Sequence, residues 1–169
     1  MAVLVTPFLL GITGAVWIVR GVIGLASPTY YAPVSTLDFT AVWTFSGALL
    51  LTAASFAALL RTWPEGDPAA GVAALAGMAA AAAASTGNAL EDAFGLDAGW
   101  MLYVAGAIGT ALAFLVLGGL ALRAERHGRL VGGALIAAAI GLFAADAGGL
   151  VMTGIAFFVL AWERLRRDR

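Results

Sequence analysis

Apolar residues form six stretches that occupy nearly all of the 169 positions, with short polar hinges between them. Crossing a hydrocarbon core of ~30 Å takes about 20 apolar residues in a helix. The stretches do not alternate with the period of two that barrel strands require. The pattern therefore predicts six transmembrane helices, at residues 3–25, 39–60, 69–90, 99–122, 129–145 and 148–163.

The last apolar run, from Leu130 to Trp162, is too long for one ordinary span and short for two. A break at residues 145–149 divides it into two compact helices. The first stretch has no basic residue at its start and is interrupted by Arg20, which favours an uncleaved span over a signal peptide. With 62% hydrophobic and 11% charged residues and a mean hydropathy of +0.98, the chain is far from a water-soluble composition. We expect one all-α integral membrane domain over residues 1–169.

Charge differs between alternate hinges. Arginines follow the second, fourth and sixth stretches, and carboxylates stand in the other hinges. Because basic residues prefer the cytoplasmic side, this bias predicts three helical hairpins with both termini in the cytoplasm, in the inner (cytoplasmic) membrane. Three of the acids (Asp38, Asp97 and Asp146) open the even-numbered spans, where Asp is a good N-cap. The arginines are Arg61, Arg123, Arg126, Arg129, Arg164, Arg166, Arg167 and Arg169, and the acids are Asp38, Glu91, Asp92, Asp97 and Asp146.

Small residues recur at every fourth position in three of the stretches. Such small-xxx-small faces let membrane helices approach each other closely. We expect them to serve packing within the chain, with dimerisation as the alternative, and we expect the alanine-rich stretch 69–90 to lie at the centre of the bundle. The three rows are Ala73, Gly77, Ala81 and Ser85; Ala105, Gly109 and Ala113; and Gly133, Ala137, Gly141 and Ala145.

Several kinds of chemistry are excluded by residues that the chain lacks. Without lysine it has no Schiff-base residue and no phosphate-binding loop lysine. Without cysteine it has no thiolate chemistry, and its single histidine, His127, stands in an arginine-rich hinge. We therefore predict no metal site and no cofactor, and we do not expect nucleic acid among the partners.

Polar residues gather toward the predicted outer surface, where we expect a pocket. Arg20 interrupts an apolar span, and a buried cation needs a partner or must reach the interface. Glu91 and Asp92 end a helix, where negative charge opposes the helix dipole. Arg20 paired with either acid is the most specific hypothesis, and a purely structural ion pair is its alternative. The predicted ligand-binding residues are Arg20, Tyr30, Tyr31, Ser85, Asn88, Glu91, Asp92 and Asp146.

Three functions stay open. A non-enzymatic ligand-binding or accessory subunit, with its pocket open to the extracytoplasmic side, fits the small size and tight packing. An intramembrane enzyme would use Glu91, Asp92 or Asp146 as a general acid on a lipid or isoprenoid. A small-solute transporter would need polar groups at the midplane, which is mostly apolar. We expect the non-enzymatic ligand-binding or accessory subunit. Its expected partners are membrane lipids and either another membrane protein or a second copy of the chain. Abundant alanine, glycine and arginine, with no lysine, indicate a prokaryotic source.

Overall fold

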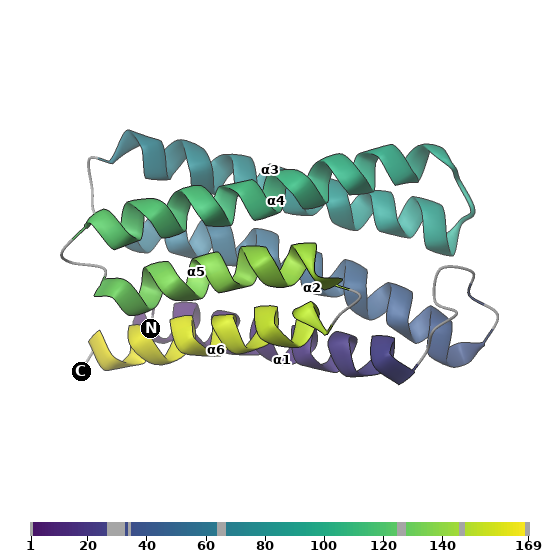
Figure 1. Cartoon of the computed structure of the whole chain (residues 1–169), viewed down its shortest axis with the longest axis horizontal. Coiled ribbons are helices and arrows are strands. Elements are labelled where there is room, and N and C mark those ends of the chain that lie inside the picture. Colours follow the sequence, from purple (N-terminus) through teal and green to yellow (C-terminus); the bar gives the residue numbers. More distant parts are fainter. Residues whose placement is uncertain are drawn as a thin grey trace.

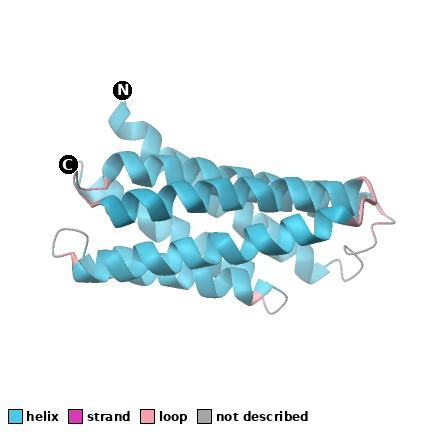
Figure 2. Cartoon of the chain, turned by 90° about the horizontal axis from the view of Figure 1, so that it is seen from above, coloured by secondary structure: helices cyan, strands magenta, loops and turns pink. Residues whose placement is uncertain are grey.

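The computed structural model describes residues 2–26, 33, 35–63, 67–124, 128–145 and 148–167. Within them the chain forms six long helices and one short π-helical turn, and Figure 2 shows helices and loops alone in this part of the chain. The predicted spans are confirmed as helices to within a few residues at each boundary. The elements are α1 (Ala2–Ala26), α2 (Thr36–Thr62), α3 (Pro68–Asn88), η1 (Ala89–Ala93), α4 (Ala98–Arg123), α5 (Gly128–Phe143) and α6 (Gly149–Arg167).

The helices run back and forth between the two ends of the bundle (Figure 1). Both chain termini and the last turns of α2 and α4 lie at one end, which we call the arginine end for Arg61, Arg123 and Arg166. The start of α2, the π-turn and the start of α4 lie at the other end, which we call the acidic end for Asp38, Glu91, Asp92 and Asp97. The α5–α6 hairpin stops short of the acidic end, because α5 has only 16 residues.

Helix starts follow capping rules, with two departures from the sequence-based expectation. Ser35, not Asp38, is the N-cap of α2, and Asp38 closes a capping box by accepting from the Ser35 backbone N–H at 2.9 Å. Asp97 holds the N-cap position of α4 but makes no capping hydrogen bond. Asp67, which we did not single out, caps α3 ahead of Pro68.

Each helix packs mainly against its neighbours in the sequence, and α6 returns to pack against α1. The helices therefore form a closed ring in the order α1 to α6. The expectation that residues 69–90 lie at the centre of the bundle is wrong, since α3 is a member of the ring that packs against α2, α4 and the π-turn. A helix with so many alanines fits a side of the ring because it lets both neighbours come close.

The axis of the ring is filled by aromatic side chains. Phe114 of α4 stacks on Phe56 of α2, with ring centroids 4.5 Å apart, and meets Phe157 of α6 edge-on at 5.8 Å. Nearer the acidic end, Phe45 of α2 lies between Trp17 and Tyr103. Except for the contact of Trp17 with Phe45, which joins the neighbours α1 and α2, these ring contacts join the alternate helices α2, α4 and α6 across the interior of the ring.

Glycines set the closest approaches between neighbouring helices. A Cβ on Gly106 of α4 would lie 2.6 Å from the Ala80 carbonyl oxygen of α3, and one on Gly14 of α1 would lie 2.7 Å from the Gly154 carbonyl oxygen of α6. The predicted row on α3 is confirmed, as its four residues are buried. The other two rows are only partly right, because Ala105 and Gly133 face outward and Gly106 and Gly132 make the contacts instead.

The outside of the bundle is apolar. Four helical segments are long and apolar enough to cross a membrane: Val5–Ala26, Thr36–Arg61, Pro68–Ala93 and Ala98–Arg123. Large side chains such as Phe8, Val72 and Met101 are more than 60% exposed along them. Since a water-soluble bundle would place polar residues there, the four apolar helices indicate a membrane protein.

Candidate functional site

The π-helical turn shapes the acidic end of the bundle. After Asn88 the helical turn widens over Ala89–Ala93 and carries Glu91 and Asp92, both partly buried. The turn is closed by hydrogen bonds from Gly95 N to Glu91 O and from Leu96 N to Leu90 O, each 2.8 Å. Gly95, with a φ of 67°, supplies the left-handed conformation that this closure needs. Single π-turns of this kind are frequent at functional sites.

Ser85 and Asn88, just before the π-turn, join α3 to α2. The Ser85 hydroxyl donates to the Ser46 carbonyl oxygen at 2.9 Å, and the Asn88 amide donates to the Ser46 hydroxyl at 3.0 Å. The same amide lies 3.4 Å from the Val42 carbonyl oxygen. Both side chains are 4% exposed. Their hydrogen-bond donors are thus engaged within the protein. These bonds hold the last turn of α3, which leads directly into the π-turn with Glu91 and Asp92, against α2.

Arg20 lies buried beneath the acidic end, with 3% of its surface exposed. Its guanidinium carbon is 5.2 Å from the centroid of the Phe45 ring, within the range of a cation–π contact. The side chain extends one turn along α1 to Gly24, where a Cβ would collide with Nη1. It therefore points toward the acidic end, as a cation does when it reaches out of an apolar layer.

The structure thus brings together five of the eight predicted residues: Arg20, Ser85, Asn88, Glu91 and Asp92 share the acidic end. The other three, Tyr30, Tyr31 and Asp146, lie outside the described residues. Sequence reasoning missed Phe45 as the ring under the guanidinium, and Gly24 as the space that admits it. The four-residue spacing of Arg20 and Gly24 is a signal that could have indicated the direction of the arginine side chain.

An open recess lies beside the π-turn. Glu91, Asp97 and Trp100 line this hollow of about 430 Å³. Trp100 is tilted against Tyr103, with ring centroids 5.8 Å apart, and Tyr103 in turn meets Phe45. Aromatic rings thus extend from the recess to the buried guanidinium, so a ligand in the recess would rest on the same packed layer as Arg20.

The arrangement offers charged and aromatic recognition groups. The described residues hold no group of three or more His, Cys, Asp or Glu side chains with the spacing of a metal site. Comparison of the chain with protein-family models, with curated proteins and with solved structures finds no match. Functional inference therefore depends on the geometry of the acidic end.

Proposed function

We propose that the protein is a non-enzymatic membrane module, a ligand-binding or accessory subunit of the prokaryotic cytoplasmic membrane, whose acidic end receives a ligand or a partner from the extracytoplasmic side. Both termini would lie in the cytoplasm, since the arginine end carries the positive charge that orients membrane proteins. The observation that carries the proposal is the buried Arg20 beneath a π-turn that bears two carboxylates. A charge so placed in an apolar span costs a few kcal/mol, and such residues mark functional sites.

The packing of the axis supports binding rather than passage through the bundle. Phe56, Phe114 and Phe157, each fully buried, fill the axis midway along the helices. Hydroxyl groups of the described interior have hydrogen-bond partners within the protein; Thr52 accepts from Trp17 of α1 at 2.9 Å, and Thr110 donates to the Gly106 carbonyl oxygen of its own helix at 2.7 Å. A transporter needs polar groups free to meet its solute near the midplane. The aromatic axis thus favours a rigid module with its polar groups at one end.

A binding role is also favoured over acid catalysis in the bilayer. Glu91 stands at the open recess beside Asp97. A general acid for an apolar substrate works best in an enclosed apolar pocket. The open and polar setting of Glu91 instead suits recognition of a polar or charged group.

The proposal is tested on the protein purified in mild detergent from its own membranes. Native mass spectrometry of the unmodified chain should show an additional retained mass, a small molecule or a second polypeptide. The variant Asp92→Asn should lose that mass, whereas Asp67→Asn, the same change of charge at the arginine end, should keep it, because asparagine can still cap α3. Both variants should keep the unmodified helical circular-dichroism spectrum.

Two results would contradict the proposal. One is a bare monomer, with neither small molecule nor partner, under conditions that preserve other membrane complexes. The other is a retained mass that Asp92→Asn leaves unchanged while the variant stays folded. Turnover of a lipid by the purified protein, abolished by Asp92→Asn, would favour the enzymatic alternative instead.

A further inference from the structure

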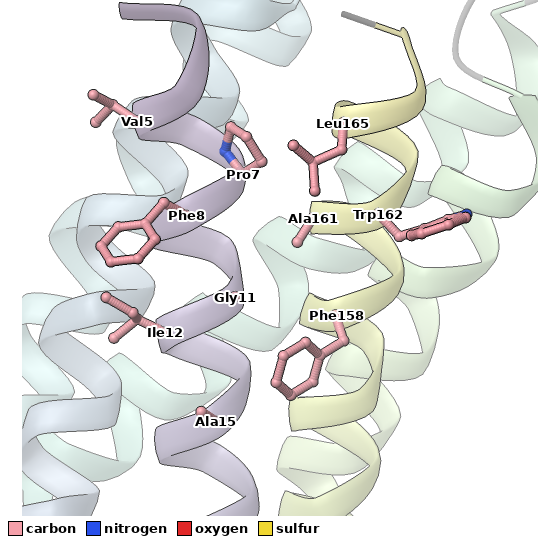
Figure 3. A pocket seen from close by; sticks show the side chains of 10 residues that line it. All are labelled: Val5, Pro7, Phe8, Gly11, Ile12, Ala15, Phe158, Ala161, Trp162 and Leu165. Atoms are coloured by element: carbon pink, nitrogen blue, oxygen red, sulfur yellow. The ribbon is translucent and has the colours of Figure 1, made fainter. Parts of the chain in front are cut away.

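An apolar groove runs along the outside of the bundle between α1 and α6, toward the arginine end. It has a volume of about 960 Å³. Figure 3 shows Pro7, Gly11 and Ala15 along α1, and Phe158, Ala161 and Leu165 projecting from α6 toward α1. The two helices are in tight contact at Gly14 and Gly154, nearer the middle of the bundle, so the groove lies between that contact and the arginine end. Its lining residues are Val5, Pro7, Phe8, Gly11, Ile12, Ala15, Phe158, Ala161, Trp162 and Leu165.

The depth of the groove matches one leaflet of a bilayer. On α1 its lining extends from Val5 to Ala15, which at ~1.5 Å per residue is a length of about 15 Å. Half of a hydrocarbon core of ~30 Å has the same thickness. Glycine at the floor leaves room, since a Cβ on Gly11 would have no other atom within 4 Å. An extended hydrocarbon chain fits these dimensions.

Positive charge stands at the end of the groove. Leu165 is a lining residue, and Arg166 follows it in the last turn of α6, one helical turn beyond Trp162. The Arg166 side chain is 69% exposed although it contacts Glu163 at 3.1 Å. Glu163 also accepts a hydrogen bond from Arg167 at 3.1 Å, so one carboxylate faces two guanidinium groups. The surplus positive charge is complementary to a phosphate group at this level.

We propose that this groove binds one acyl chain of an anionic phospholipid from the leaflet at the arginine end, with the phosphate group held against Arg166. The match in depth and the charge at one end favour this occupant over a helix of a second copy, which would need no basic residue beside an apolar groove. The inference uses the membrane location of the chain and is independent of the ligand at the acidic end.

The test compares two lipids with the same acyl chains, phosphatidylglycerol and phosphatidylcholine, added to delipidated full-length protein in detergent and followed by native mass spectrometry. We expect one phosphatidylglycerol to bind about fivefold more tightly than phosphatidylcholine, the effect of a single basic side chain. Arg166→Gln should remove this preference. Arg123→Gln, a change of an exposed arginine at the same end on α4, should leave it unchanged.

The groove itself is tested by filling it. Gly11→Leu should weaken the binding of both lipids at least fivefold, and Gly119→Leu on α4, where a Cβ also has no atom within 4 Å, should not. Should Gly11→Leu fail to fold, Ala15→Leu takes its place, and the Arg166→Gln comparison stands by itself. Equal binding of the two lipids by the unmodified protein, or a dimer that Gly11→Leu dissociates, would overturn the proposal.

Discussion

The contact between α3 and α4 can be tested through one glycine. Replacing Gly106 with alanine would add a Cβ 2.6 Å from the Ala80 carbonyl oxygen and against the backbone amide of Ala84. An ordinary contact begins at 3.4 Å, so the two helices would have to part by at least about 0.8 Å. Gaps of ~0.5–1 Å already forfeit a quarter to a half of the dispersion attraction between facing atoms. Membrane helices associate through this packing and have no hydrophobic effect between them to compensate.

The magnitude follows from a comparison with a second glycine of the same helix. Alanine is favoured over glycine inside a helix by about 1 kcal/mol, and this gain applies equally to Gly106→Ala and Gly119→Ala. A Cβ on Gly119 has no atom within 4 Å, so Gly119→Ala keeps the gain. Overpacking typically costs about 1–3 kcal/mol. The free energy of unfolding should therefore be about 1–3 kcal/mol lower for Gly106→Ala than for Gly119→Ala.

The assay is reversible unfolding in mixed micelles, with sodium dodecyl sulfate added stepwise to the protein in a mild detergent. Far-ultraviolet circular dichroism and the fluorescence of the five tryptophans report helix content and packing separately. Equal midpoints for the two variants would refute the reasoning, because α3 and α4 would then not meet at Gly106. If the unfolding slopes of the two variants differ, their free energies of unfolding are compared at one detergent composition that lies within both transitions.

Three further predictions concern the hydrogen bonds of Asn88 to α2, the aromatic axis and the topology. Asn88→Ala should lower the free energy of unfolding by about 0.6–1.7 kcal/mol because α2 loses its amide contacts, whereas Thr86→Ala, an exposed position on the same turn, should change it little in the same assay. Phe114→Ala should lower the free energy of unfolding by about 2 kcal/mol, which is the cost of a void of ~100 Å³ at about 24 cal/mol per Å³. No cost of transfer to water is added, because the phenylalanine side chain would return to lipid on unfolding. An unchanged free energy of unfolding would mean that the axis is not packed. In a chain that has no natural cysteine, Asp97→Cys should react with an impermeant maleimide on intact cells and Arg166→Cys only after permeabilisation, and labelling of both from one side would contradict the proposed orientation.

The helices could be predicted from the sequence because length and hydropathy act locally. The division of the last apolar run near Asp146 was found in the same way and agrees with the end of α5 at Phe143 and the start of α6 at Gly149. The order of helices around the ring depends on which faces meet, and a sequence that is apolar on all sides carries little information about that. For this reason the position of α3 was wrong, and Gly106 was missed beside the row that was chosen on α4.

The candidate site was predictable in part for a similar reason. A charge in an apolar span, such as Arg20, is conspicuous by its cost, and so are the acids Glu91 and Asp92 at the end of a helix. The π-turn that carries these acids depends on one extra residue in a helical turn and on the closure at Gly95. Hydropathy has no signal for it, and the position of Phe45 beneath the guanidinium requires the packing of α1 against α2.

The closure of the ring by α1 and α6 has a consequence for biosynthesis. Neighbouring helices can associate pairwise as they leave the ribosome, because their contacts are local along the chain. The contact between Gly14 and Gly154, by contrast, joins α1 to α6, which is synthesised only after the four helices between them. Until α6 enters the bilayer, the face of α1 that packs against it, around Gly14, is exposed to lipid. A quality-control protease or chaperone that recognises exposed faces of small residues would encounter this face in every nascent copy.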